Sequence, residues 1–145
     1  MQENKPLGPL LGYCAHLARE RMDARLTPYD VTPAQIYVLH YLYHCGNEAP
    51  QCEVTAHLKV KPSTANGILD RMEEKDLLRR SISESDGRKR LITLTEKGAG
   101  LQEVLRQKFE ETEQLMTQGF SEAEAAQLHE LLRRVMVNLE EDRDV

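Results

Sequence analysis

The strongest constraint in this sequence is a change of hydrophobic period near residue 75, from a helical repeat to alternation. Four apolar side chains before the change lie at positions i, i+3, i+4 and i+7: Ala65, Ile68, Leu69 and Met72. Such a stripe has to face a core. After the change, two alternating stretches, 78–83 and 90–94, flank a turn that contains Asp86-Gly87. Because this is a strong hairpin signal, the segment predicts a helix that leads into a β-hairpin.

A shorter helix is expected just before the first one. Val54 and Leu58 lie four residues apart, residues 59–61 form a tight connection, and Pro62 opens the next helix, where its missing N–H costs nothing. The outer face of that next helix is polar and consists of Ser63, Asn66, Gly67, Asp70 and Arg71. Two helices joined by a short turn in this way form a helix-turn-helix.

The hairpin has a predicted inner and outer face. In its first strand we expect Leu78, Ile82 and the stem of Arg80 on one face, because side chains alternate along a strand. Three consecutive cations, residues 88–90, lie at or beside the tip. A helix-turn-helix followed by a hairpin with a basic tip is a winged helix.

Further helices are expected on both sides of this segment. One spans about residues 9–25, and the next begins where Thr32 caps the helix and Gln35 reaches back to it. The latter carries three apolar residues on one face: Ile36, Leu39 and Tyr43. Two long helices, over about 95–119 and from Ser121 onward, carry narrow apolar stripes. Such stripes usually pack against another helix, of the same chain or of a partner.

Charge is distributed unevenly along the chain. The net charge is −5 over 145 residues, which by itself argues against a nucleic-acid partner. Residues 59–97 nevertheless hold ten Lys or Arg against seven Asp or Glu, a local +3, while the remaining residues carry −8. A basic centre between acidic ends lets one face meet phosphates while the rest keeps the protein soluble.

Several classes of protein are not expected. The sequence has no apolar run long enough for a membrane span and no visible secretory signal. Three cysteines are too few and too oddly numbered for a disulfide framework, which favours a reducing cytoplasm. A Gly-rich phosphate loop, a metal-ligand motif and a nucleophile elbow are all missing from the sequence, so we expect no enzyme, no cofactor, no metal and no membrane partner.

Each part of a winged helix has a use on DNA. The second helix enters the major groove with its first residues at the base edges. Asn66 is suited to reading adenine, and Arg88 is placed for the neighbouring minor groove. The residues expected to contact double-stranded DNA are Lys61, Ser63, Thr64, Asn66, Gly67, Arg71, Arg88, Lys89 and Arg90.

The order of elements and three motifs resemble the MarR family of bacterial winged helix-turn-helix transcriptional regulators. The most specific motif begins at Asp86-Gly87-Arg88 and ends at Leu94-Thr95-Glu96-Lys97-Gly98, similar to the family's D-x-R, strand, L-T-x-x-G signature. Val31-Thr32-Pro33-Ala34-Gln35 resembles its L-T-P-x-Q motif. Pro62-Ser63-Thr64, with residues 69–77, resembles its recognition helix and exit. Two departures are Lys61, where the family usually has a capping residue, and Asp76, where it commonly has Gly.

The resemblance implies a homodimeric regulator, more specifically a repressor, that binds a pseudo-palindromic operator and is released by a small-molecule effector. It assigns Asp86 to orienting Arg88 in the wing. It also implies a fold class that is mainly α with a small β-hairpin wing, an α/β winged helix-turn-helix flanked by dimerisation helices. We expect one domain, 1–145, in three regions: 1–30 and 96–145 for dimerisation and 31–95 for DNA binding. The expected dimer residues are Leu7, Leu10, Leu128, Leu132 and Val135.

The tyrosines of the first two helices suggest an effector pocket. Relatives often bind small, frequently phenolic, anions between these helices and the winged helix, although aromatic residues also serve to pack helices. The residues expected to line this pocket are Tyr13, His16, Tyr37 and Tyr41.

Three alternatives remain open from the sequence. Cys14 could sense oxidants, but buried structural cysteines are favoured for Cys14, Cys45 and Cys52, because a reactive thiol needs a cationic and partly exposed setting. His40 and His44 are spaced to hold zinc, yet a histidine pair near a dimer interface is favoured. The third alternative is a protein-interaction adaptor, against which the basic hairpin tip argues.

Overall fold

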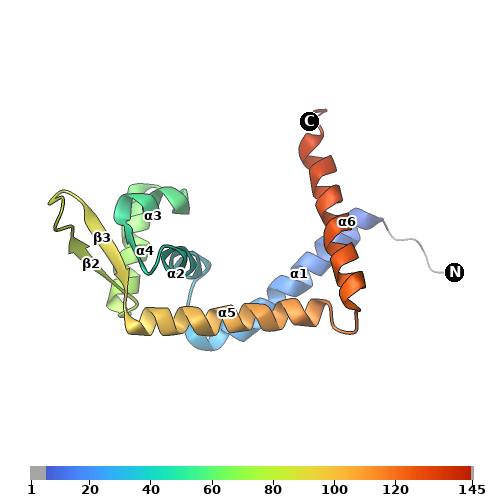
Figure 1. Ribbon diagram of the computed structural model, residues 1–145, viewed down its shortest axis with the longest axis horizontal. Helices are drawn as coiled ribbons and strands as arrows, with labels where there is room; N and C mark the ends of the chain where they lie inside the picture. The colour runs from blue at the N-terminus through green and yellow to red at the C-terminus, as the bar shows by residue number, and fades with distance from the viewer. Residues whose placement is uncertain (1–5, 145) are drawn as a thin grey trace. The chain divides into compact units, whose positions relative to one another are not determined.

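The computed structural model describes residues 6–144, in which the predicted mainly helical fold with a small antiparallel sheet is confirmed (Figure 1). The elements in chain order are α1 (Leu7–Leu26), the 3-10 helix η1 (Thr27–Tyr29), α2 (Pro33–His44), β1 (Glu48–Pro50), α3 (Gln51–Leu58), α4 (Pro62–Glu74), β2 (Leu78–Ile82), β3 (Arg90–Leu94), α5 (Glu96–Met116) and α6 (Glu122–Glu141). The chain forms two compact units, Met1–Glu110 and Glu111–Val145. The boundary between the units therefore falls inside α5, within the region 96–145 that the sequence assigns to dimerisation. None of the helices within 6–144 has both the length and the apolar character that crossing a membrane requires.

The core of the first unit lies between α2, α4 and the sheet. Its largest completely buried side chains include Leu39, Leu42, Leu69, Met72, Leu78 and Ile92. The predicted stripe of α4 is confirmed, since Ala65, Ile68, Leu69 and Met72 are all buried. Burial of this stripe fixes the rotation of α4 about its axis, so its opposite, polar side has to face solvent.

The buried side of α2 differs from the prediction. Its buried residues are Gln35, Val38, Leu39 and Leu42, while Ile36 is half-buried and Tyr43 is exposed. The choice of Tyr43 as a core residue was therefore wrong. A helix advances 100° per residue, so a stripe centred between Val38 and Leu42 leaves Tyr43 at its edge.

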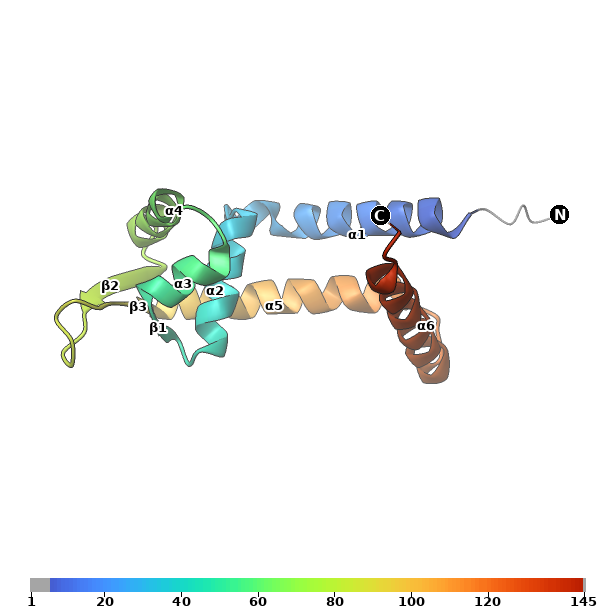
Figure 2. The same cartoon turned by 90° about the horizontal axis from the view of Figure 1, so that it is seen from above.

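The sheet has three antiparallel strands in the order β1-β3-β2. Strand β1 was not predicted, because Glu48–Pro50 is a three-residue strand that exists only by pairing with β3, where Ala49 lies opposite Ile92. The hairpin β2–β3 was predicted, and it extends beyond the helices of its unit (Figure 2). Ile82, expected on the inner face, is 66% exposed, because it pairs with Arg90 at the outer end of the ladder, past the core.

The start of α2 has its predicted capping box. Thr32 Oγ1 accepts a hydrogen bond from the Gln35 amide, and the Gln35 side chain accepts one from the Thr32 amide, both at 3.2 Å. Ser121 and Glu124 form the same capping box at the start of α6. Each box satisfies two amide groups that the first turn of a helix leaves without partners.

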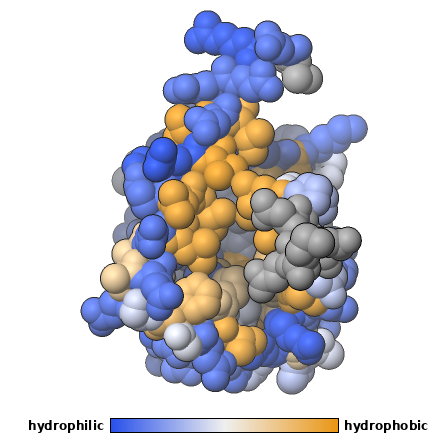
Figure 3. Space-filling model, turned by 90° about the vertical axis from the view of Figure 1, so that its right-hand side faces the viewer, coloured by the Kyte–Doolittle hydropathy of each residue, from blue (hydrophilic) through white to orange (hydrophobic). Residues whose placement is uncertain are grey.

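The second unit consists of the end of α5, a turn at Gly119 with φ of +85°, and α6. No residue of α6 is buried within the described chain. Its exposed large apolar side chains are Leu128, Leu131, Leu132, Met136 and Leu139. The space-filling view shows an apolar band on this face of the molecule (Figure 3). A large exposed apolar band of this kind is typical of an interaction surface.

The start of α5 is held tightly against the segment that joins α4 to β2. Thr95 donates hydrogen bonds from its amide to the Leu77 carbonyl at 3.2 Å and from Oγ1 to the Asp76 carbonyl. Thr95 Oγ1 also accepts from the Gly98 amide at 3.0 Å. A Cβ added at Gly98 would lie 2.0 Å from the Leu77 carbonyl oxygen. Glycine is therefore required at position 98, the last residue of the L-T-x-x-G motif, because two backbone segments approach closely there.

We expect Gly98→Ala to lower the free energy of unfolding by about 1–3 kcal/mol, because the added methyl group forces the two backbones apart. The matched control is Gly100→Ala, where an added Cβ meets nothing within 4 Å. That change should instead stabilise α5 by about 0.5–1 kcal/mol, since alanine is the better helix former. Urea unfolding of both variants measures the difference, and equal effects would contradict the close approach.

Candidate nucleic-acid interface

The turn between α3 and α4 presents a helix start without a side-chain cap. Lys59 ends α3 in the left-handed conformation, with φ of 54°. Lys61 occupies the N-cap of α4 in an extended conformation and makes no capping hydrogen bond. The first turn of α4 contains no acidic residue. Its backbone amides and the positive end of the helix dipole therefore suit a phosphate group.

The predicted contact residues at the start of α4 share one solvent-facing side. Lys61, Ser63, Thr64, Asn66 and Arg71 are exposed, and Gly67 is half-buried. The Arg71 guanidinium lies over Gly67, since a Cβ built at Gly67 would be 3.6 Å from Arg71 Nη2. The missing side chain at position 67 thus gives room for Arg71 to extend toward the start of the helix.

Asn66 has a partner that the sequence did not reveal. Gln51, the first residue of α3, donates a hydrogen bond from Nε2 to Asn66 Oδ1 at 2.8 Å. This contact holds the Asn66 carboxamide in one orientation and leaves its NH₂ group to donate elsewhere. No sequence pattern indicated Gln51, because its contact depends on how α3 and α4 pack.

The tip of the hairpin is ordered by Asp86. Its Oδ1 accepts a hydrogen bond from the backbone amide of Arg88 at 3.0 Å, and its carbonyl accepts from the Lys89 amide at 3.0 Å. The expectation was that Asp86 orients the arginine, and the observed contact is to the Arg88 backbone. Arg88, Lys89 and Arg90 are all exposed.

One surface hollow brings the hairpin and the helix-turn-helix together. It is lined by Pro50, Gln51, Cys52, Thr55, Pro62, Arg88, Lys89 and Arg90. The three cations of the hairpin therefore share this hollow with the first residue of α4. Three cations around one concave surface concentrate positive potential there.

Arg80 ties β2 to α4. Its guanidinium contacts the carboxylates of Asp70 and Glu73, and its backbone amide donates to Glu73 Oε2 at 3.1 Å. The hydrogen bond to Asp70 is the main reason that the pKa of Arg80 is raised above its ordinary value, and partial burial opposes it. Two carboxylates of α4 therefore neutralise this half-buried cation, and their contacts hold the hairpin against α4.

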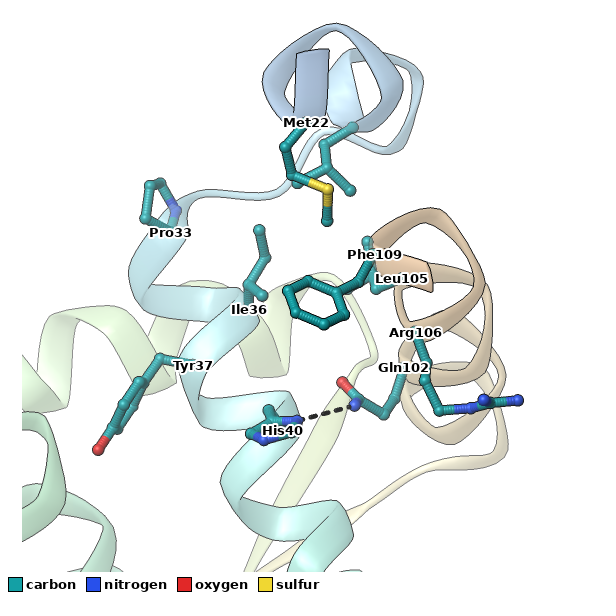
Figure 4. A pocket seen from close by; sticks show the side chains of 10 residues that line it. Met22, Pro33, Ile36, Tyr37, His40, Gln102, Leu105, Arg106 and Phe109 are labelled. Carbon is teal, nitrogen blue, oxygen red and sulfur yellow. Dashed lines mark hydrogen bonds between the residues drawn. The ribbon is translucent and has the colours of Figure 1, made fainter. Parts of the chain in front are cut away.

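A second candidate site is a cavity of about 340 Å³ beside α2 and α5 (Figure 4). Its lining consists of Met22, Leu26, Pro33, Ile36, Tyr37, His40, Gln102, Leu105, Arg106 and Phe109. Of the four expected pocket residues only Tyr37 contributes, and its ring points away from Gln102 and Phe109 in this view. A polar residue, Gln102, between apolar residues of α5 was the available sequence signal.

The other three expected pocket residues lie elsewhere in the first unit. Tyr13 and His16 stack on each other along α1, with ring centroids 6.4 Å apart. Tyr41 packs against His57 with ring centroids 4.2 Å apart. The pKa of Tyr41 is raised, first by desolvation and then by a hydrogen bond with Cys45. The structure therefore does not bring these tyrosines into one site.

The cysteines differ from the sequence expectation. Cys14, Cys45 and Cys52 are all exposed, so the preference for buried structural cysteines was wrong for this chain. Each lies on or beside a helix side that does not face the core. His40 and His44 contact each other edge to face at 4.3 Å, and within 6–144 no three metal-ligating side chains form a group.

The expected dimer residues lie on exposed or half-exposed helix sides. Leu7 and Leu10 are exposed on α1, which has no buried residue among those described. Leu128 and Leu132 are exposed on α6, and Val135 is half-buried. Apolar side chains at these positions gain from being covered by another surface.

Comparisons with known proteins agree with the winged-helix geometry. A MarR family model matches residues 29–89, which include α2, β1, α3, α4 and the hairpin tip. MepR, a transcription regulator of the Staphylococcus aureus multidrug efflux pump MepA, is 27% identical, with a TM-score of 0.80 over 92% of this chain and 98% of that one. MepR bound to ethidium bromide is 28% identical, with a TM-score of 0.74 over 92% and 96%. A mutant of E. coli MarR complexed with operator DNA is 29% identical, with a TM-score of 0.66 over 90% and 94%.

Proposed function

Because this chain belongs to the MarR family of transcription regulators, we propose that it is a homodimeric repressor. It binds a pseudo-palindromic operator in double-stranded DNA, acts in the cytoplasm and leaves the operator when a small molecule binds. One solved structure of MepR and one of MarR contain DNA, and another structure of MepR contains ethidium. These structures support DNA and a small molecule as partners of this chain.

The observation that carries the proposal is the shared surface of the wing and the helix-turn-helix. Arg88, Lys89 and Arg90 line the same hollow as Pro62, at the uncapped start of α4. The start of α4 enters the major groove, and the hairpin lies over the adjacent backbone and minor groove. Polar side chains of α4 then read base edges, while the wing cations provide affinity that depends on salt.

Two copies are needed to read a pseudo-palindrome. The dimer interface in this proposal includes Leu7, Leu10, Leu128, Leu132 and Val135 of each copy. Covering the apolar band of α6 removes several large side chains from water, at roughly 25 cal/mol per Å² of apolar surface. The two recognition helices then lie roughly 34 Å apart, one turn of duplex.

Release by an effector follows from the spacing of these two helices. A small molecule shifts the equilibrium only by binding the DNA-incompetent arrangement more tightly than the competent one. The cavity beside α2 and α5 is the candidate binding site, because it lies on the helices that connect the winged helix to the proposed dimer contacts.

Asn66→Ala and Arg88→Ala should affect DNA binding differently. We expect Asn66→Ala to reduce the preference for operator over random duplex by about 1–3 kcal/mol, because it removes a base contact. Arg88→Ala should weaken binding to both duplexes more evenly and lower its salt dependence. Fluorescence anisotropy with genomic fragments selected by the protein measures both effects, and Arg143→Ala, outside the first unit, serves as the control. Equal losses on operator and random DNA for both variants would contradict the assignment.

The same titration separates a DNA-binding regulator from a winged-helix adaptor. An adaptor that uses this surface for a protein partner has no need of phosphate contacts. Affinity for duplex that ignores salt, or that survives replacement of Arg88 and Lys89 by alanine, would favour the adaptor.

Replacing Leu128 and Leu132 together by aspartate should convert the dimer into monomers, because each buried charge would be unpaired. Ala123→Asp is the matched control, because residue 123 is exposed and lies on the side of α6 opposite to Leu128 and Leu132 at 100° per residue. Sedimentation velocity reads the oligomeric state of all three proteins. A monomeric wild-type protein, or a double variant that stays dimeric, would refute this interface.

A further inference from the structure

The cavity beside α2 and α5 contains one buried polar atom that the fold leaves unsatisfied. Gln102 is only 4% exposed. Its Nε2 donates a hydrogen bond to His40 Nδ1 at 3.4 Å. Its Oε1 is buried and has no hydrogen-bond partner among the described residues. A buried acceptor without a donor is costly, so the site favours an occupant that supplies one.

The unsatisfied oxygen points into an apolar space. Figure 4 shows it on the side of Gln102 that faces Ile36 and the ring of Phe109. The apolar lining is completed by Met22, Leu26, Pro33 and Leu105. A single acceptor within apolar walls selects an apolar molecule and fixes its orientation through one hydrogen bond.

The cation in the lining is already neutralised. Arg106 Nε donates to Glu103 Oε2 at 3.1 Å, and Nη1 contacts Glu110. Glu103 is the main cause of a raised pKa at Arg106. Arg106 also extends to the outer side of α5, away from His40 and Phe109 (Figure 4). The arginine of the lining is therefore paired with Glu103 and Glu110 and is not directed at a bound anion.

We propose that this cavity binds an uncharged, mainly apolar molecule that donates one hydrogen bond to Gln102 Oε1. A cavity of about 340 Å³ lies at the small end of the range for ligand pockets, which suits a molecule of one or two fused rings. The further claim that this molecule is the effector rests on the proposed function, and it specifies the chemistry of that effector. It narrows the small-molecule effector that the resemblance suggested to an uncharged one.

Three matched probes test the hydrogen bond and the charge with the full chain in the absence of DNA. Indole donates through its N–H, 1-methylindole has the same ring without a donor, and indole-3-carboxylate keeps the donor and adds a negative charge. Isothermal titration calorimetry should show indole binding about tenfold more tightly than 1-methylindole, because the methylated ring leaves Oε1 unsatisfied. Indole-3-carboxylate should bind more weakly than indole.

Gln102→Leu tests whether this side chain is responsible. The variant should lower the ratio of indole to 1-methylindole affinity to about one, since leucine has no acceptor. Gln107→Leu, on the exposed side of α5, is the matched control and should keep the wild-type ratio. Thermal unfolding followed by circular dichroism establishes that both variants are folded. If a variant does not fold, the ratio of indole to 1-methylindole affinity in the wild-type protein still tests the proposal.

Several results would overturn the proposal. They are equal wild-type affinities for indole and 1-methylindole, tighter binding of indole-3-carboxylate, no binding of indole up to its solubility limit, or an unchanged ratio in folded Gln102→Leu. None of these measurements contains DNA. A failure here therefore leaves the DNA-binding proposal intact, and a failure of operator binding leaves these affinity ratios unaffected.

Discussion

Burial of one side of α4 is the constraint on which the candidate interface depends. Ala65, Leu69 and Met72 are completely buried, and truncating a buried Leu or Met typically costs about 2–5 kcal/mol. Rotating the helix to expose this stripe would lose a comparable amount at each position, so the rotation is fixed. The side that carries Ser63 and Asn66 must then face solvent. The burial of the apolar side of α4 therefore determines which polar side chains of this helix are available to a DNA groove.

The proposed contact of the hairpin with DNA depends on its fixed position relative to α4. Arg80 contacts two carboxylates of α4 from the middle of β2. At the other end of the sheet, the Gly98 backbone comes so close to the Leu77 carbonyl that no side chain fits. Hydrogen bonds from Asp86 shape the tip that carries the cations. The strongly held groups thus position the wing, and the exposed cations remain available for phosphates.

Features fixed by neighbours in the sequence could be predicted, and those fixed by distant contacts could not. The stripe of α4 and the capping box at Thr32 follow from local spacing, and both are present. Strand β1 exists only through pairing with β3, and the exposure of Ile82 follows from how far the hairpin extends beyond the core. The Gln102 cavity likewise depends on the approach of α2 and α5. Periodicity along one helix shows which side is apolar, but it does not show which second helix covers that side.

The central claim is that α4 and the wing form one rigid surface that reads a single duplex. Hydroxyl-radical footprinting on a selected genomic fragment tests it most directly. The experiment compares the wild-type protein, Arg80→Met and the control Arg79→Met, which changes an exposed arginine next to Arg80. The wild-type protein and Arg79→Met should protect a central segment and an adjacent minor-groove segment. Arg80→Met should keep the first and lose the second, because the wing is no longer held against α4. An unchanged footprint for folded Arg80→Met would contradict the account.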